Sequence, residues 1–421
     1  MLMNIRNTAK RPTSPHPILN LGFRIFFVGA AVFAIISMLL WLLILQGVAP
    51  FKGVINPFYW HGHEMVFGYA LAVIAGFLLT AVKTWTNQPM PYSWQLLAIF
   101  IPWALARVLW LGLHALPSQS MLVMAFILDM LFWGLTSFFV IKAVWAARQK
   151  RQIGIAAKLI LLLLANIVFY IGVFLNDDIQ KTAIYAALYL VIAVVFTIGR
   201  RVLPFFISKG ISVDNIGKPN GINIEQKNST FLDNMSLVGL AGFLIFDVLI
   251  VMPKVMALFA LLCFIANILR IKNWYHTGIW QKPLLWSLVI AFFGMTLSLL
   301  FFVFTPFVNS SLNLHSLGLH GLALFGVGLM TVSMMARVSL GHTGRNIHEP
   351  PKTVSAIFIL MIIAGVCRVI MPVISPLLSM NYMTYMTWIL ISQMAWIISF
   401  ALFCISYVGI LAKPRTDGLF G

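Results

Sequence analysis

Long apolar runs follow one another along the whole chain, separated by short polar segments. Each run holds about 17–25 residues, the length that an α-helix needs to cross the hydrocarbon core of a bilayer. The pattern predicts an all-α polytopic membrane protein with about twelve transmembrane helices. The predicted spans are Ile25–Leu45, His63–Val82, Gln95–Leu113, Met121–Ala143, Ile155–Leu175, Ala183–Leu203, Met235–Met252, Val255–Ile271, Leu284–Phe304, Leu319–Met335, Val354–Met371 and Thr387–Leu411.

The composition excludes a soluble domain. Of 421 residues, 61% are hydrophobic and 9% are charged, and the mean hydropathy is +0.97; a soluble protein carries about 25% charged residues. The first apolar run is too long for a signal peptide and no small-residue cleavage pattern closes it, so we expect it to be the first transmembrane helix. The cysteines Cys263, Cys367 and Cys404 lie far apart inside apolar runs. We expect them to be buried and unpaired.

The net charge of +18 reflects the orientation of the helices. With the amino terminus inside, 22 of the 28 lysines and arginines fall on the inner side and five on the outer side or in outer helix halves. This asymmetry is the one that the positive-inside rule predicts, with both termini cytoplasmic. The basic residues therefore indicate contact with the anionic lipid of the bilayer and require no nucleic-acid partner.

The predicted spans form one membrane domain (1–421) with an internal repeat. We expect helices 1–6 in 18–203, a cytoplasmic linker loop in 204–233, helices 7–12 in 234–412 and a cytoplasmic tail in 413–421. "HEMVFGYALAVIAGFLLTAVKTW" followed by "LLAIFIPWALARVLW" parallels "HGLALFGVGLMTVSMMARV" followed by "AIFILMIIAGVCRVIMP". Helices two and three thus resemble helices ten and eleven, and helices six and seven give a weaker third copy. Three repeated four-helix units are predicted.

Some ionisable residues lie within the membrane helices or at their ends, and five of them are singled out here. Each costs about 2.5–3.5 kcal/mol on insertion scales, so such residues are candidates for function. They are Arg24, Arg107, Asp129, Asp247 and Arg368.

Two histidines match in the repeat. His63 opens helix two, about 30 Å along the helix axis from Lys83, and His320 opens helix ten, about 26 Å from Arg337. The two helices are predicted to be parallel, which places both imidazoles at a similar depth near the outer face. Neutral imidazoles on two helices can ligate a haem iron from opposite sides. Histidines at helix ends are also common as interfacial residues, and this alternative stays open.

Two arginines match in the same repeat. Arg107 and Arg368 lie within two turns of the outer ends of helices three and eleven, where their guanidinium groups would suit the propionates of a haem. An ion pair between Arg107 and Asp129 is an equal alternative for Arg107. The chain has no CxxCH sequence for covalent attachment, so the haem would be a non-covalent b-type haem.

The remaining candidate ligands lie on both sides of the membrane. His61 is two residues from His63, so on a regular helix its side chain points about 200° away and would serve a second metal or the surroundings of the haem. On the inner side, His16 and His342 lie near Arg24 and Arg345. This inner group is predicted to hold copper; an anion site and plain interfacial anchoring are the alternatives.

The chain resembles the NnrS family. The segments "HPILNLGFRIFF", "WHGHEMVFGYALAVIAGFLLTAVKTW", "GRRVLPFF", "LHGLALFGVGLMTVSMMARVSLGHTGR" and "KPRTDGLFG" carry the resemblance over essentially the whole chain. It implies a bacterial inner-membrane protein that contains haem and copper and acts in nitric oxide metabolism and resistance to nitrosative stress. The positions that match the family's motifs are His16, Arg24, His61, His63, Glu64, Arg107, Asp129, Asn166, Arg201, His320, His342, Arg345 and Arg368.

The threefold plan is also similar to haem–copper oxidase subunit I, a likeness of fold that carries no function by itself. It has one departure, because the oxidase takes copper ligands from helices six and seven and the corresponding spans here contain no histidine.

Three classes of function remain. The first is a haem protein, with copper as a second metal, that binds nitric oxide and reduces it with electrons from a quinol or a cytochrome. The second is a transporter of copper or an anion, with Arg24, Asp129 and Asp247 along its path. The third is a sensor or assembly factor that uses the cytoplasmic linker.

Overall fold

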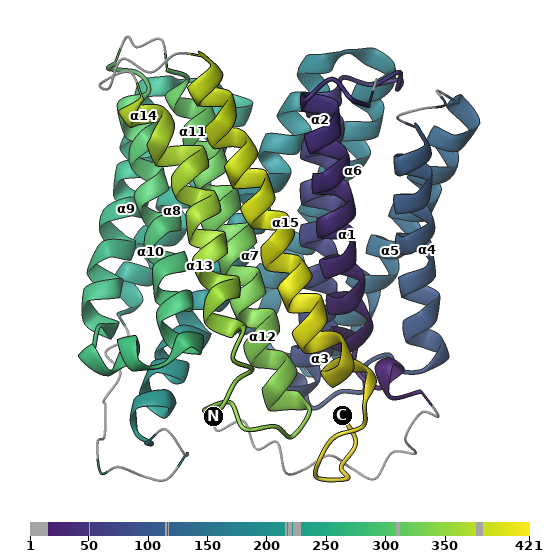
Figure 1. Cartoon of the computed structure of the whole chain (residues 1–421), viewed down its shortest axis with the longest axis vertical. Helices are drawn as coiled ribbons and strands as arrows, with labels where there is room; N and C mark the ends of the chain where they lie inside the picture. The colour runs from purple at the N-terminus through teal and green to yellow at the C-terminus, as the bar shows by residue number, and fades with distance from the viewer. Residues whose placement is uncertain are drawn as a thin grey trace. The chain divides into compact units, whose positions relative to one another are not determined.

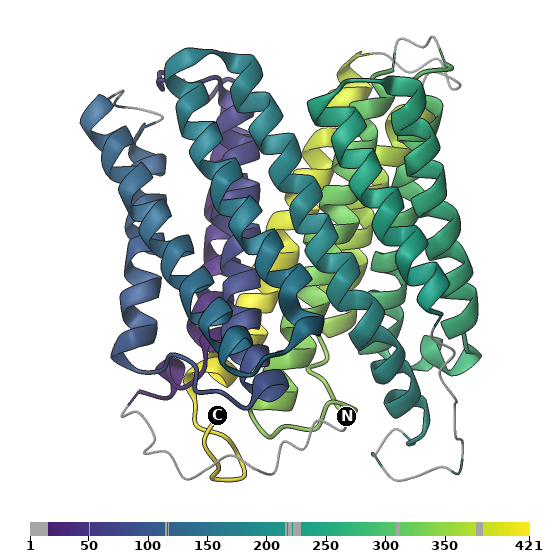
Figure 2. The same ribbon diagram turned by 180° about the vertical axis from the view of Figure 1, so that it is seen from behind.

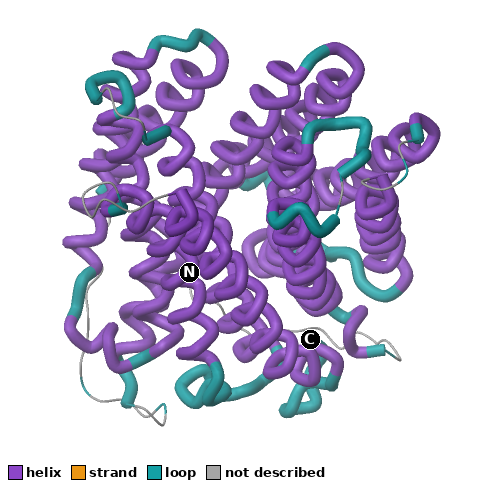
Figure 3. Tube along the Cα trace, turned by 45° about the horizontal axis from the view of Figure 1, so that its top comes forward, coloured by secondary structure: helices purple, strands orange, loops and turns teal. Residues whose placement is uncertain are grey.

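The computed structural model describes residues 16–49, 51–113, 116, 118–214, 217, 221, 229–308, 312–375 and 382–421. Twelve helical segments among them are long and apolar enough to cross a membrane, and each overlaps one predicted span. The tube in Figure 3 is helical along most of its length. The predicted all-α fold with twelve spans is therefore confirmed; the similarity to haem–copper oxidase subunit I stays a prediction.

The chain divides into two compact units, and each is described by itself. Unit 1 comprises Met1–Val191, Met335–Arg345 and Phe400–Gly421, and unit 2 comprises Ile192–Met334 and Asn346–Ser399.

The helices are shown in Figure 1. Unit 1 contains α1 (Gly22–Leu45), α2 (Pro57–His63), α3 (Leu71–Thr86), α4 (Trp94–Leu113), α5 (Gln119–Ala146) and α6 (Ile153–Leu175). Unit 2 contains α8 (Thr230–Leu244), α9 (Pro253–Trp274), α10 (Pro283–Phe304), α11 (Leu314–Gly321), α13 (Val354–Gly365) and α14 (Met371–Ile374). Parts of α7 (Asp177–Ile211), α12 (Met330–His342) and α15 (Tyr382–Ala412) belong to each unit. The 3-10 turns are η1 (Pro17–Leu19), η3 (Lys150–Gln152) and η5 (Thr277–Gln281).

Local sequence signals set many helix ends. Ser118 and Ser229 accept hydrogen bonds from the backbone of the first turns of α5 and α8, as N-cap residues do. Proline occupies the first turn of α2, α9 and α10, where its missing N–H costs nothing. Helix α3 ends at Asn87, whose φ of 55° is the left-handed conformation that stops a helix.

Within each unit, consecutive helices pack as antiparallel neighbours. In unit 1, α4 lies along α5 and α1 lies along α3. Gly76 lets α1 approach, since a Cβ there would lie 2.8 Å from Cβ of Phe26. In unit 2, α8, α9 and α10 lie side by side, as Figure 2 also shows.

Burial recurs every fourth span. In the most apolar 18-residue stretch of each span, the share of buried residues is 89% in span 2, 78% in span 6 and 83% in span 10. In every other span identified among the described residues this share is 50% or less. Spans 2 and 10 also share a plan, since each begins with a short α-helix, continues as a π-helical segment and ends as a longer α-helix. This period is the one that the sequence repeat predicts. Part of the predicted linker 204–233 lies outside the described residues; α7 continues to Ile211 and α8 begins at Thr230.

Candidate functional site

In the part of the chain that the structure describes, four π-helical segments interrupt the spans, and each lies at an ionisable residue singled out from the sequence. They are η2 (Glu64–Ala70), directly after His63; η4 (Ile245–Leu249), which contains Asp247; η6 (Leu322–Leu329), two residues after His320; and η7 (Val366–Ile370), which contains Arg368. π-helical segments are rare in proteins, but those that occur are often found at functional sites. The wider turn changes the direction of side chains and leaves a backbone carbonyl free. These four places are therefore the candidate sites.

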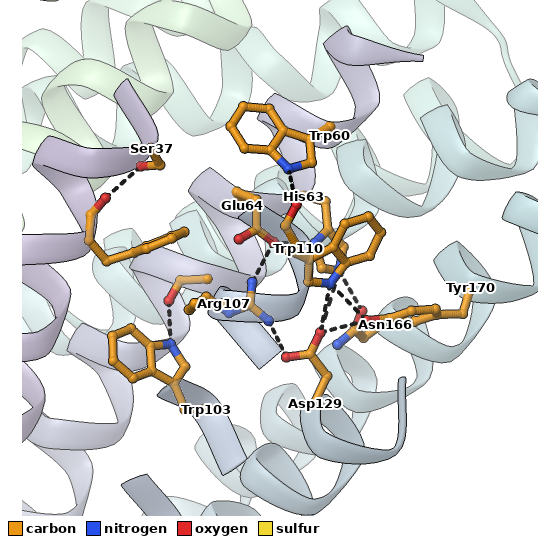
Figure 4. A network of polar contacts seen from close by, with 12 residues as sticks. Ser37, Trp60, His63, Glu64, Trp103, Arg107, Trp110, Asp129, Asn166 and Tyr170 are labelled. Atoms are coloured by element: carbon orange, nitrogen blue, oxygen red, sulfur yellow. Dashed lines mark hydrogen bonds and ion pairs between the residues drawn. The ribbon is translucent and has the colours of Figure 1, made fainter. Parts of the chain in front are cut away.

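The most connected site is the buried network of unit 1, shown in Figure 4. Arg107 on α4 donates one hydrogen bond to Oε1 of Glu64 and another to Oδ1 of Asp129 on α5. All three side chains are at most 3% exposed, so this is a desolvated ion triad. The predicted pairing of Arg107 with Asp129 is confirmed.

Aromatic donors complete the environment of Asp129. Its Oδ2 accepts a hydrogen bond from the hydroxyl of Tyr170 at 2.7 Å and a longer one from the indole of Trp110 at 3.4 Å. The same indole donates to the Tyr170 hydroxyl at 2.9 Å. A carboxylate with this many donors is fixed in place.

His63 lies at the centre of the network and is fully buried. Its Nδ1 is 2.8 Å from Oε1 of Glu64 and its Nε2 is 3.2 Å from Oδ1 of Asn166 on α6. The ring centroid lies 4.4 Å from that of Phe169 and 4.6 Å from that of Trp110. The network engages both ring nitrogens, so ligation of iron by His63 would require Nε2 to exchange Asn166 for the metal. That role stays a prediction.

The charges of the network define what it can do chemically. One guanidinium faces the two carboxylates of Glu64 and Asp129, and an excess negative charge is costly in a membrane interior. One further proton makes the group neutral. The 2.8 Å contact between His63 and Glu64 can hold this proton on either partner. The network therefore has a place for one proton, at a contact next to Arg107.

A glycine leaves room for the guanidinium. A Cβ on Gly68 would lie 2.9 Å from Nη1 of Arg107 and 2.7 Å from the ring of Phe33. The Gly68 carbonyl accepts a hydrogen bond from the indole of Trp103 at 2.8 Å, which satisfies a backbone group inside the π-helical segment.

Replacing Gly68 with alanine should therefore lower the melting temperature of the protein, because Arg107 must shift. Gly134 is a matched control in α5, since a Cβ there would meet nothing within 4 Å. Gly134→Ala should raise stability by about 0.5–1 kcal/mol. Thermal unfolding in detergent checks both variants; equal melting temperatures for the two would contradict the packing role of Gly68.

His61 points away from this network. Its ring stacks on Trp41 of α1, with centroids 4.6 Å apart and planes 8° apart, while His63 faces α6. The predicted divergence of the two imidazoles is confirmed. Its assignment to a second metal stays a prediction.

The matched pair of unit 2 has a different geometry. His320 is half-buried, and its Nδ1 lies 2.8 Å from the backbone oxygen of Ser316, one turn earlier on α11. A carbonyl accepts only, so Nδ1 carries the proton and Nε2 carries the lone pair. Nη2 of Arg368 lies 3.3 Å from this Nε2. The structure therefore brings His320 and Arg368 together in unit 2, and His63 and Arg107 belong to unit 1. The shared haem that was predicted for the two histidines stays a prediction.

The other candidates have separate partners. Asp247 contacts Nε2 of His315 through both carboxylate oxygens, at 2.9 Å and 3.0 Å. His16 is exposed before η1, and His342 is half-buried at the end of α12. Among the described residues, no three His, Cys, Asp or Glu side chains are grouped so as to hold a metal ion. A copper site at His16 and His342 stays a prediction.

Sequence reasoning missed Trp110 and Tyr170. Trp110 follows Arg107 by three residues and Tyr170 follows Asn166 by four, spacings that place each pair on one helix face. Polar aromatic residues at this spacing from an in-span charge were the available signal. Glu64 and Asn166 were identified only through the family's motifs.

Comparisons with known proteins identify the family of the chain. No curated protein matches the sequence significantly. The family model described as "NnrS protein" matches residues 17–415, nearly the whole chain, and includes every residue of the buried network and of the His320 pair. This multi-pass membrane protein belongs to the NnrS family.

Proposed function

We propose that this protein is a haem-binding protein of the bacterial inner membrane, with both termini cytoplasmic, that binds nitric oxide and gives resistance to nitrosative stress. The observation that carries the proposal is the pair of contacts made by the ring nitrogens of His320. The backbone oxygen of Ser316 accepts a hydrogen bond from Nδ1–H, an arrangement that is common in metal-ligating histidines. The Nε2 lone pair lies next to the guanidinium of Arg368.

These residues fit a b-type haem. His320 would supply a nitrogen ligand to the iron, and Arg368 would turn from the imidazole to a propionate, where its fork could form two hydrogen bonds. When bound, the haem would supply the redox-active iron that takes nitric oxide. The haem would be held without a covalent bond to the protein.

The buried network of unit 1 fits the same function as a proton store. Reduction of nitric oxide consumes protons as well as electrons. His63 and Glu64 would share one proton, and Arg107, which also contacts Asp129, would hold Glu64 in place. Copper as a second metal and a quinol or cytochrome as electron donor complete the proposal. The family resemblance implies the copper, and the electron donor is proposed because reduction of nitric oxide requires electrons.

Purification of the full chain followed by an absorption spectrum and metal analysis tests the proposal. We expect a Soret band, iron at about one or more per chain, and a shift of the band when nitric oxide is added anaerobically to the reduced protein. Protein that is folded, contains no iron and gains no Soret band when haem is added would contradict it. Copper content from the same sample tests the second metal.

A further inference from the structure

A group of basic side chains gathers where the carboxyl-terminal tail meets the ends of α1, α3 and α12 in unit 1. We name it the basic cluster; it consists of Arg24, Lys83, His342, Arg345 and Arg415. The positive-inside count predicts that this end of the unit faces the cytoplasm. Arg201, which shares the family's motifs, is exposed and lies in unit 2, so it is not part of the cluster.

The tail is folded against the end of α12, as the loop at the lower end of Figure 1 shows. Arg415 donates to the backbone oxygen of His342 at 3.1 Å, and the Thr416 hydroxyl donates to that of Gly344 at 2.7 Å. Phe420 is 6% exposed and packs between Tyr92 and the ammonium group of Lys83. The cluster is therefore a built feature of the fold, held by backbone contacts and a buried ring.

Arg24 is the centre of the cluster and is fully buried. Its Nη1 donates to the backbone oxygens of Leu411 at 2.6 Å and Lys413 at 2.8 Å, which caps the end of α15. Its Nη2 and Nε are buried too, and neither has a hydrogen-bond acceptor among the described residues. A buried charged donor without an acceptor is costly, so this half of the guanidinium is the part of the cluster that needs a partner.

The charges around Arg24 are unbalanced. Arg345 and Arg415 act on it by Coulombic repulsion, and Arg415 and Lys83 act in the same way on His342. The one side-chain carboxylate that the described residues bring to the cluster is Asp417, which Arg415 contacts at 2.9 Å and 2.5 Å. These hydrogen bonds lower the pKa of Asp417 to about 2, so it is ionised at neutral pH. The cluster therefore holds more cationic than anionic side chains.

We propose that the basic cluster binds an oxyanion of the phosphate type, with the unpaired half of the Arg24 guanidinium and Arg345 as its main donors. Guanidinium groups suit the tetrahedral oxyanion, because their parallel N–H groups match its oxygen atoms. The anion supplies the missing acceptor and the missing negative charge at once. Its source is either a free inorganic anion or the phosphate of an anionic lipid, and the experiment separates the two.

The experiment measures thermal unfolding of the full chain, purified in a nonionic detergent. Inorganic phosphate is added in one series and phosphatidic acid in mixed micelles in another, each against sodium chloride or phosphatidylcholine as a control. A ligand that binds only the folded protein raises the melting temperature in a saturable way. We expect this rise with at least one of the two probes and none with either control.

Two variants assign the effect to the cluster. Arg345→Gln removes a half-buried cation whose one described contact is a 3.4 Å hydrogen bond to Thr343, so the fold should tolerate it. It should weaken binding of the effective probe about tenfold or more, the effect of one lost charge-assisted hydrogen bond. Lys150→Gln is the matched control, an exposed cation of unit 1 outside the cluster, and should leave binding unchanged.

Each outcome decides the matter. A rise with phosphate that Arg345→Gln weakens identifies a free oxyanion as ligand. A rise only with phosphatidic acid, again weakened by Arg345→Gln, identifies the lipid headgroup. No saturable rise with either probe overturns the proposal. Equal weakening by Arg345→Gln and Lys150→Gln also overturns it, since that result reports only general charge attraction.

Discussion

Replacing His320 with alanine should abolish the Soret band or shift it strongly, while the protein still inserts into the membrane. The imidazole is the proposed ligand of the iron. Its Nδ1–H contact to Ser316 is within its own helix, and its contact across helices is the one between Nε2 and Arg368 on η7. Absorption spectra and iron analysis of the purified variant measure the effect. Loss of an axial nitrogen of this kind lowers iron content at equal protein concentration.

His315→Ala is the matched control for this prediction. His315 lies on the same helix α11 and contacts Asp247 on η4, away from the Arg368 pair. It should keep the wild-type spectrum. An unchanged spectrum in His320→Ala would remove this residue from the iron and leave His63 as the candidate ligand in the other unit.

Replacing Arg107 with methionine should lower the free energy of unfolding by about 3–5 kcal/mol. The change leaves the carboxylates of Glu64 and Asp129 buried without their shared cation, and an uncompensated buried charge costs about that much. Thermal unfolding or a denaturant titration in mixed micelles measures the loss.

The control for this prediction neutralises the two partners. The triple variant Arg107→Met, Glu64→Gln, Asp129→Asn removes all three charges, so it should be clearly more stable than Arg107→Met alone. A triple variant whose destabilisation equals the sum of the three single effects would show that the side chains do not act as one ion triad. Retention of haem by Arg107→Met would also separate the network from the haem site.

The fold could be predicted from the sequence because a bilayer leaves few choices. Every backbone polar group must be paired within a span, so an apolar run of sufficient length is a helix. The run Pro283–Phe304 differs from its predicted bounds by one residue. The largest differences occur where a helix continues past the apolar core, as α7 does to Ile211 and α12 to His342. Polar residues at those ends lower the hydropathy, so a search for apolar runs stops before the helix does.

The candidate site could be predicted only in part. Charges inside spans are identifiable from their cost, so Arg107 and Asp129 were found and one alternative paired them. Their full set of partners depends on which helix faces which, and no pattern within a single span encodes that. The π-helical segments add a second obstacle, because residues on the two sides of η2 do not follow one regular helical period.

The π-helical segments also bear on how the length of these spans can vary. A π turn closes its hydrogen bond over five residues and an α turn over four, so η2 and η6 each accommodate one residue more than a regular helix would. Losing a single residue there would let the backbone close as an ordinary α-helix without breaking the span. The part of the span before the deletion would then be rotated by about 100° against the part after it. The backbone would accept such a deletion, but His63 or His320 would be turned away from its partners.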